Sequence, residues 1–232
     1  MAAYWPHIYL LIFILVIVAL EKLFPKFMAS AEENVLVLII ASIMLVSFGQ
    51  VIARYGFNTG WAAALEFNTV AFSWLILLGM SYGIKIGLHL GVDILLNAVP
   101  DKLSKMLSLF GAAAAMAYGL LLLDSIWLAS LVDLTNLDIP IKGGAIEYWS
   151  KMYKVGIGSE ELRYPLFMQE MFDLQPRIHR WIVLLVLPVS LAMLSLRSLQ
   201  AFIQIYQGKR KMLISAHEAQ ELVAENKDIL KD

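Results

Sequence analysis

The stretch Glu66–Asp93, EFNTVAFSWLILLGMSYGIKIGLHLGVD, decides the fold of this chain. It begins as an apolar helix and carries no charged residue from Ala71 to Ile84. Glycine then recurs at every fourth position, at Gly79, Gly83, Gly87 and Gly91. Because positions i and i+4 share one face of a helix, these glycines would form a groove without side chains.

A glycine groove would weaken a helix in water, since each interior glycine costs about 1 kcal/mol relative to alanine. In a bilayer the same groove lets a second helix approach closely. We therefore expect Gly79, Gly83 and Gly87 to lie at a helix crossing, within this chain or against a partner. The alternative is that the glycines only reflect the abundance of glycine in membrane helices.

The composition indicates an integral membrane protein. Of the 232 residues, 60% are hydrophobic and the mean hydropathy is +0.72, whereas about half of the residues of a soluble domain are apolar. The net charge of -1 gives no indication of a nucleic-acid partner. The absence of cysteine excludes disulfides and thiolate chemistry.

An uninterrupted apolar run occupies residues 8–20. A cleaved signal peptide is one interpretation, but no Lys or Arg precedes the run. A stretch of small residues at 29–31 resembles a cleavage site, yet it comes about ten residues after the run and beyond Pro25. We therefore predict a retained helix from about Tyr4 to Phe24, which is long enough to span a bilayer.

Four further segments have the length and character of membrane spans. They lie at about 32–53, 66–84, 103–131 and 179–206. In the third of these, Gly111, Ala115 and Gly119 recur every four positions and predict a second close-packing face. Pro188 lies inside the last segment and predicts a kink. The predicted fold class is all-α, a polytopic membrane helical bundle.

We expect the chain to divide into a transmembrane helical domain at 1–208 and a cytoplasmic amphipathic tail at 209–232. The transmembrane domain includes an outer loop at 133–178, which is the long polar stretch between spans. Within this loop Ile146, Trp149 and Tyr153 recur at helical spacing, with charged residues beside them. The spacing predicts a short amphipathic helix on the membrane surface.

Orientation follows from the basic residues, which gather on the cytoplasmic side of membrane proteins. Five spans place most of them on one side, at Lys22, Lys26, Lys85, Lys102, Lys105 and Lys209–Lys211. The C-terminal tail is therefore expected to be cytoplasmic. The N-terminus and the 133–178 loop are expected on the outer side.

Arg54 is a charged residue at the end of a predicted span. An arginine in this position either anchors the helix at the interface or requires a partner, because burying its charge is costly. One interpretation is an anchor. The other is an ion pair with Glu66 across the short loop, or a contact with a partner protein.

His89 and Asp93 lie four positions apart, so they could form half of a metal site. They are the basis of an alternative function, a membrane enzyme or metal protein. A metal site needs three or four converging ligands, and the other histidines are scattered along the sequence. This pattern therefore gives the alternative little support.

Several motifs lie in a fixed order. Arg54-Tyr55-Gly56-Phe57-Asn58 is followed by Glu66, by Trp74-Leu75 with Gly79, and by Gly87-Leu88-His89-Leu90-Gly91-Val92-Asp93. Together they resemble the small membrane subunit, of the DctQ type, of tripartite ATP-independent periplasmic (TRAP) transporters. In that family an Arg-Tyr-x-Phe-Asn stretch ends the first shared helix, and a Gly-x-His-x-x-Val-Asp stretch follows the second. The resemblance is close over about Asn34–Lys105.

The resemblance implies a bacterial inner-membrane protein that forms a heterodimer with a large transport subunit. A periplasmic binding protein would deliver the substrate, usually an organic acid, and a sodium gradient would drive symport. The small subunit would be a scaffold rather than an enzyme and would need no cofactor. The segment around Tyr148–Glu161 resembles the C4-dicarboxylate branch. An extra N-terminal helix and the long outer loop depart from the family's four-span pattern.

The outer loop is also a candidate docking surface for the binding protein. It offers Lys151, Lys154 and Arg163 alongside acidic residues, and mixed exposed charges steer the encounter of two proteins. The alternative is that Trp149 and Tyr153 only hold a surface helix on the bilayer.

Overall fold

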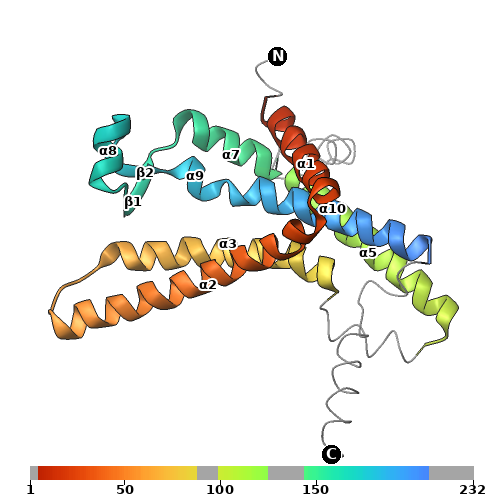
Figure 1. The fold of residues 1–232 in the computed structure, drawn as a ribbon. Coiled ribbons are helices and arrows are strands. Elements are labelled where there is room, and N and C mark those ends of the chain that lie inside the picture. Colours follow the sequence, from red (N-terminus) through yellow and green to blue (C-terminus); the bar gives the residue numbers. More distant parts are fainter. Residues whose placement is uncertain (1–4, 88–98, 125–143, 209–232) are drawn as a thin grey trace, which may run out of the picture. The chain divides into compact units, whose positions relative to one another are not determined.

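A computed structural model describes residues 5–87, 99–124 and 144–208 of the chain. Contacts divide the chain into two compact units. The first comprises Met1–Gly79 and Leu120–Met193, and the second comprises Met80–Gly119 and Leu194–Asp232. The described residues are mostly helical (Figure 1).

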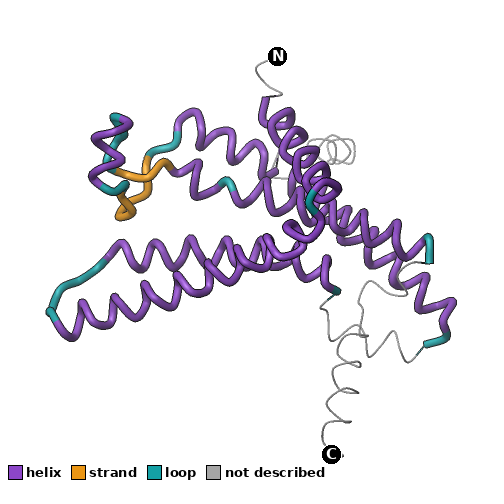
Figure 2. Tube along the Cα trace, in the orientation of Figure 1, coloured by secondary structure: helices purple, strands orange, loops and turns teal. Residues whose placement is uncertain are grey.

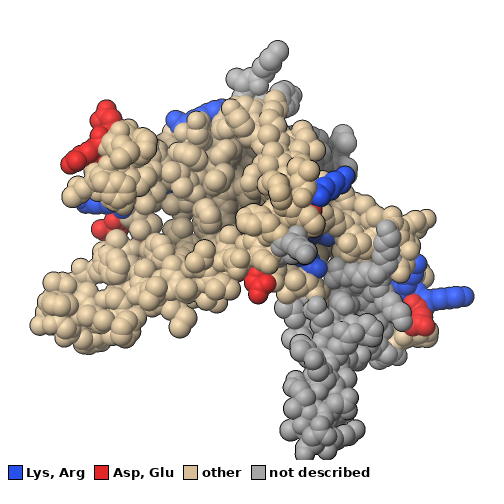
Figure 3. All heavy atoms as spheres, in the orientation of Figure 1, with Lys and Arg blue, Asp and Glu red and all other residues tan. Residues whose placement is uncertain are grey.

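In these described ranges, five helical segments are long and apolar enough to cross a membrane, which confirms the predicted all-α membrane bundle. They are α1 (Trp5–Leu23), α2 (Pro25–Gly56), α3 (Ala62–Ile86), α5 (Asp101–Leu123), and α9 (Arg180–Leu184) with α10 (Val186–Tyr206). The predicted N-terminal helix is among them. On the face seen in Figure 3, most of the surface over α2 and α3 carries no charged side chain, as expected of spans.

The junction between α1 and α2 differs from the prediction. Only Phe24 separates the two helices, and α2 begins at Pro25 rather than near Glu32. Proline suits the first position of a helix, because its missing N–H would have no intrahelical acceptor there and its φ is already helical. Pro25 therefore ends one helix and begins the next without a loop.

Asn58 ends α2 by adopting a left-handed backbone, with a φ of 52°. Thr59 then donates its backbone N–H at 3.0 Å and its hydroxyl at 3.2 Å to the carbonyl oxygen of Ala53. Asparagine tolerates this conformation better than most residues. Helix α3 begins at Ala62, four residues before the predicted start at Glu66.

Helix α5 is shorter than predicted. The prediction continued it to about Leu131, but it ends at Leu123, and residues 125–143 lie outside the described part of the chain. The end of α5 lies against Gly144, which has a φ of 62°. A Cβ at this position would lie 2.7 Å from the carbonyl oxygen of Leu122, so only glycine fits.

The helix predicted within the outer loop is confirmed as α7 (Gly144–Val155), with Ala145, Ile146 and Trp149 buried. A two-stranded antiparallel sheet of β1 (Gly158–Arg163) and β2 (Arg177–His179) follows, with α8 (Leu166–Phe172) between the strands (Figure 2). The sequence did not predict this sheet. Strand β1 reads GSEELR and lacks the alternation of apolar and polar residues that reveals a strand.

The kink predicted from Pro188 is confirmed as a break between α9 and α10. Helix α9 ends at Leu184 and α10 begins at Val186. Because Pro188 has no N–H, the carbonyl of Leu184 receives no helical hydrogen bond from it. At the same break, the N–H of Leu185 bonds the carbonyl oxygen of Ile182, three residues earlier, at 3.3 Å.

Burial within the chain is concentrated in the last span. In its most apolar window 56% of the residues are buried, against 6% to 22% in the other four candidate spans. Those four spans direct most of their side chains outward. Lipid or a partner subunit must cover such large apolar surfaces.

Candidate functional site

One carboxylate in the first turns of α3 holds strand β1. Glu66 accepts backbone N–H groups from three consecutive residues of β1: Glu160 at 3.1 Å, Glu161 at 2.7 Å and Leu162 at 2.8 Å. Hydrogen bonds to an ionised acceptor contribute about 1.5–3 kcal/mol each. A carboxylate can take all three because both of its oxygens accept and neither donates.

These three N–H groups lie in an irregular part of β1. Gly158 pairs with His179 and Arg163 pairs with Arg177, so five steps along β1 match only two steps along β2. Such a bulge leaves backbone groups without partners in the sheet. Glu66 supplies acceptors for three of these N–H groups, so a residue of a membrane helix stabilises the bulge.

Trp74 makes a second contact from α3 to the last third of the chain. Its indole N–H donates to the backbone carbonyl oxygen of Val183, in α9, at 2.9 Å. Glu66 and Trp74 therefore attach β1 and α9 to α3 through backbone groups.

A cluster of four aromatic side chains, Trp5, Trp149, Tyr153 and Trp181, holds α7. Trp149 donates its indole N–H to the carbonyl oxygen of Trp181 at 3.0 Å, and its ring lies 5.5 Å from that of Trp5. The ring of Tyr153 lies 5.0 Å from Trp5 and 5.3 Å from Trp181. Trp149 is only 9% exposed, so protein contacts rather than the bilayer surface occupy its ring.

Helix α1 is also attached to the end of α5. Nε2 of His7 lies 2.7 Å from Oδ2 of Asp124, and both side chains are partly exposed. Asp124 is the first residue after α5, so this pair and the aromatic cluster fix the start of α1 at two points.

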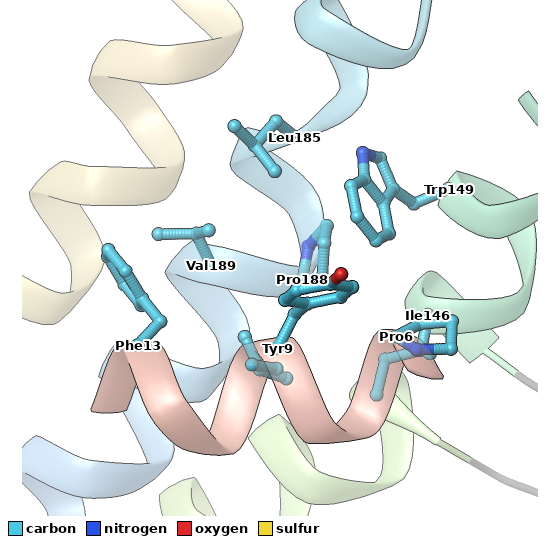
Figure 4. A pocket seen from close by; sticks show the side chains of 9 residues that line it. Pro6, Tyr9, Phe13, Ile146, Trp149, Leu185, Pro188 and Val189 are labelled. Carbon is cyan, nitrogen blue, oxygen red and sulfur yellow. The ribbon is translucent and has the colours of Figure 1, made fainter. Parts of the chain in front are cut away.

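A cavity of about 220 Å³ opens beside the aromatic cluster. Its walls come from α1, α7 and the break between α9 and α10 (Figure 4). The lining residues are Pro6, Tyr9, Leu10, Phe13, Ile146, Trp149, Leu185, Pro188 and Val189. None of them carries a charge.

Residues 43–208 match the family described as tripartite ATP-independent periplasmic transporters, DctQ component. The chain belongs to this family. The match covers the turn at Asn58, both contacts made by α3, and the bulged strand, whereas α1 lies before it. The chain is therefore a small permease subunit of a TRAP transporter and a multi-pass membrane protein.

Two curated relatives carry the name C4-dicarboxylate TRAP transporter small permease protein DctQ. The protein from Vibrio cholerae is 30% identical over 204 residues, which cover 84% of this chain and 80% of the relative. The protein from Pseudomonas aeruginosa is 26% identical over 176 residues, covering 75% of this chain and 68% of the relative. No solved structure matches the chain.

The first family motif lies at the end of α2, where its side chains face outward. Arg54, Tyr55 and Phe57 are all exposed. Within the described residues Arg54 forms no ion pair with Glu66, whose carboxylate contacts β1. The proposed pair across the loop is therefore wrong, and the interpretation of Arg54 as an anchor or a partner contact stays a prediction.

The second family motif falls largely outside the described residues. His89 and Asp93, the predicted half of a metal site, both lie there. Across the described ranges, no group of three or more histidines and acidic residues could hold a metal ion. The DctQ family consists of transporter subunits rather than enzymes, so the alternative function is not favoured.

The predicted packing glycines fall into two groups. A Cβ at Gly79 or at Gly111 would meet no atom within 4 Å, so neither position forms a close crossing within the described chain. Gly83 and Ala115 are half-buried, and Gly87 and Gly119 are buried. Whether these faces contact another helix stays a prediction.

The predicted docking residues are on the surface. Lys151, Lys154 and Arg163 are exposed on α7 and β1, and Lys151 pairs with Glu147 one turn earlier at 2.8 Å.

The sequence interpretation missed Arg197. This arginine lies inside α10, is only 4% exposed, and donates a hydrogen bond to Gln200 at 2.8 Å. A charged residue within a membrane span is a functional candidate by default. That rule could have singled out Arg197 from its place in the last apolar segment.

Proposed function

We propose that this chain is the scaffold subunit of a sodium-driven transporter for an organic acid, with C4-dicarboxylates as the substrate class. The family match over residues 43–208 carries the proposal, and the names of two relatives support the substrate class. In this role the chain holds no transport site. It enlarges and anchors the scaffold against which the large subunit moves its substrate domain.

The exposed spans support a role as scaffold. Four of the five candidate spans leave most of their side chains uncovered by this chain. Gly79 and Gly111 offer open, side-chain-free positions that a helix of the large subunit could approach closely. We assign the large subunit and a periplasmic binding protein as the partners.

The contacts within the first unit support the predicted sidedness. His7 meets Asp124, Trp5 meets Trp149, and Glu66 meets β1. The start of α1, the turn between α2 and α3, and the 144–179 segment thus share one end of the spans. We assign this end to the periplasmic side of the inner membrane, and the C-terminus to the cytoplasmic side.

Reconstitution tests the proposed function directly. Liposomes would contain this chain, the large subunit or both, with the binding protein outside, and the uptake of labelled succinate would be measured. We expect uptake only with all three proteins and an inward sodium gradient. Uptake by this chain alone would exclude the scaffold role, and undiminished uptake with choline in place of sodium would exclude sodium coupling.

A second experiment tests the assembly face on α5. Gly111→Leu places a bulky side chain where the chain itself leaves open space. It should leave the isolated chain folded but reduce co-purification of the large subunit. Ala117→Leu, at an exposed position on another side of α5, is the matched control. Equal recovery of the complex with both variants would show that the Gly111 face contacts lipid.

A further inference from the structure

The cavity lined by α1, α7 and the last span has no part in the proposed transport function. We propose that it binds one acyl chain of a membrane phospholipid, and that α1 forms the wall that retains this chain. The proposal depends on the protein crossing a bilayer and is independent of the transported substrate.

The walls offer water few hydrogen-bond partners. Among the side chains of the nine lining residues, two carry a polar group, the hydroxyl of Tyr9 and the indole N–H of Trp149. The indole N–H of Trp149 is already donated to the carbonyl oxygen of Trp181 and is not free to bind a water molecule. Apolar cavities of about 150 Å³ stay dry and take up small hydrocarbons. A cavity of about 220 Å³ is large enough for several methylene groups of an acyl chain.

The position of the cavity points to lipid as the source of the hydrocarbon. It adjoins the cluster of Trp5, Trp149, Tyr153 and Trp181. Tyr153 in this cluster is 52% exposed, and exposed tyrosines of membrane proteins gather at the level of the lipid headgroups. Its other walls belong to α1 and α10, both parts of candidate spans. Since the cavity is partly open, an acyl chain can enter it from the surrounding bilayer.

Helix α1 contributes four of the nine lining residues, among them Tyr9 and Phe13. Figure 4 shows the rings of Tyr9 and Phe13 on the side of the cavity opposite Leu185. These two side chains are 62% and 40% exposed, so an acyl chain in the cavity would cover apolar surface that the protein leaves open. The pair of His7 with Asp124 holds α1 in this position.

Filling the cavity from either side tests the proposal. Leu10→Trp adds volume from α1 and Val189→Phe adds volume from α10, so the test survives if one variant fails to fold. Leu15→Trp is the control, because Leu15 lies on α1, is 59% exposed and does not line the cavity. The full-length proteins would be purified from membranes, washed extensively in detergent and examined by native mass spectrometry and lipid extraction.

We expect the wild-type protein and Leu15→Trp to retain one phospholipid per chain that both filled variants lose. Equal retention by all four proteins would overturn the proposal, as would loss of the lipid in Leu15→Trp. A wild-type protein that holds only detergent would also overturn it. Retention of a free fatty acid in place of a phospholipid would keep the acyl-chain site but overturn the phospholipid as its source.

Discussion

The carboxylate of Glu66 accepts the backbone N–H of Glu161 at 2.7 Å, across 95 positions of the sequence. The contact joins the beginning of a membrane helix to a strand outside the spans. The partner on β1 is a backbone group, so no side chain of that strand identifies the contact in the sequence. Glu66 therefore sets the position of the β1–β2 hairpin relative to α3.

Replacing Glu66 by Gln should loosen β1. A glutamine side chain has the same size as glutamate but only one acceptor oxygen. Its NH₂ group is a donor and would face a backbone N–H group of β1, so these two groups cannot form a hydrogen bond. Losing one hydrogen bond to a charged acceptor costs about 1.5–3 kcal/mol. We expect the amides of residues 160–162 to exchange hydrogen about 10- to 100-fold faster, measured by mass spectrometry in detergent or nanodiscs.

Glu160→Gln provides the matched control. It makes the same chemical change as Glu66→Gln, but in an exposed side chain of β1 itself. It should leave exchange at 160–162 unchanged. Unchanged exchange in Glu66→Gln would mean that the pairing of β1 with β2 alone protects these amides.

The helices were predictable because their signal is local. Apolar length, Pro188 and the spacing of Ile146, Trp149 and Tyr153 gave the spans, the break and α7. The errors lie where local signals compete. The apolar pattern predicts a second span from near residue 32, whereas Pro25 itself suits the first position of a helix. Apolar residues also continue beyond Leu123, so the pattern does not mark the end of α5.

The candidate site was only partly predictable, because the place of a residue in a family motif does not tell which other residue it contacts. The sequence singled out Glu66 and offered Arg54 as its partner, since opposite charges attract. The structure gives it three backbone N–H groups instead. Strand β1, with no periodic apolar pattern, gave no signal that such donors existed.

Replacing Trp74 by Phe should destabilise the attachment of α9 to α3. The phenylalanine ring fills most of the space of the indole ring, but the carbonyl oxygen of Val183 loses the indole N–H donor, whose nitrogen lies 2.9 Å away. Loss of a typical hydrogen bond costs about 0.5–1.5 kcal/mol. We expect a lower midpoint of thermal unfolding, followed by fluorescence-detected size exclusion. Trp61→Phe, an exposed tryptophan in the turn after α2, should unfold like the wild type.

The pair of His7 and Asp124 should stabilise the N-terminal helix. A double-mutant cycle of His7→Ala, Asp124→Ala and the double variant isolates the interaction from other effects of each change. Because both side chains are partly exposed, we expect a coupling of about 0.2–1 kcal/mol. Strictly additive losses of thermal stability would show that the aromatic contacts of Trp5 alone hold α1.

Reversing charge on α7 should slow transport if this helix receives the binding protein. Lys151→Glu with Lys154→Glu changes two exposed cations to anions. Exposed charges act on the rate of encounter more than on affinity, and salt screens them. We expect a lower rate of succinate uptake at low salt, a smaller effect at high salt, and normal recovery of the complex.

The pair of Lys151 with Glu147 complicates this change, because Lys151→Glu also removes an ion pair on the helix. The exchange variant Glu147→Lys with Lys151→Glu resolves the ambiguity, since it keeps the pair and the net charge of α7 while reversing their order. Such pairs contribute only about 0.2–0.5 kcal/mol, so the exchange variant should fold and transport almost as well as the wild type. If the double reversal also transports like the wild type at every ionic strength, α7 does not guide the binding protein, and docking belongs to another surface.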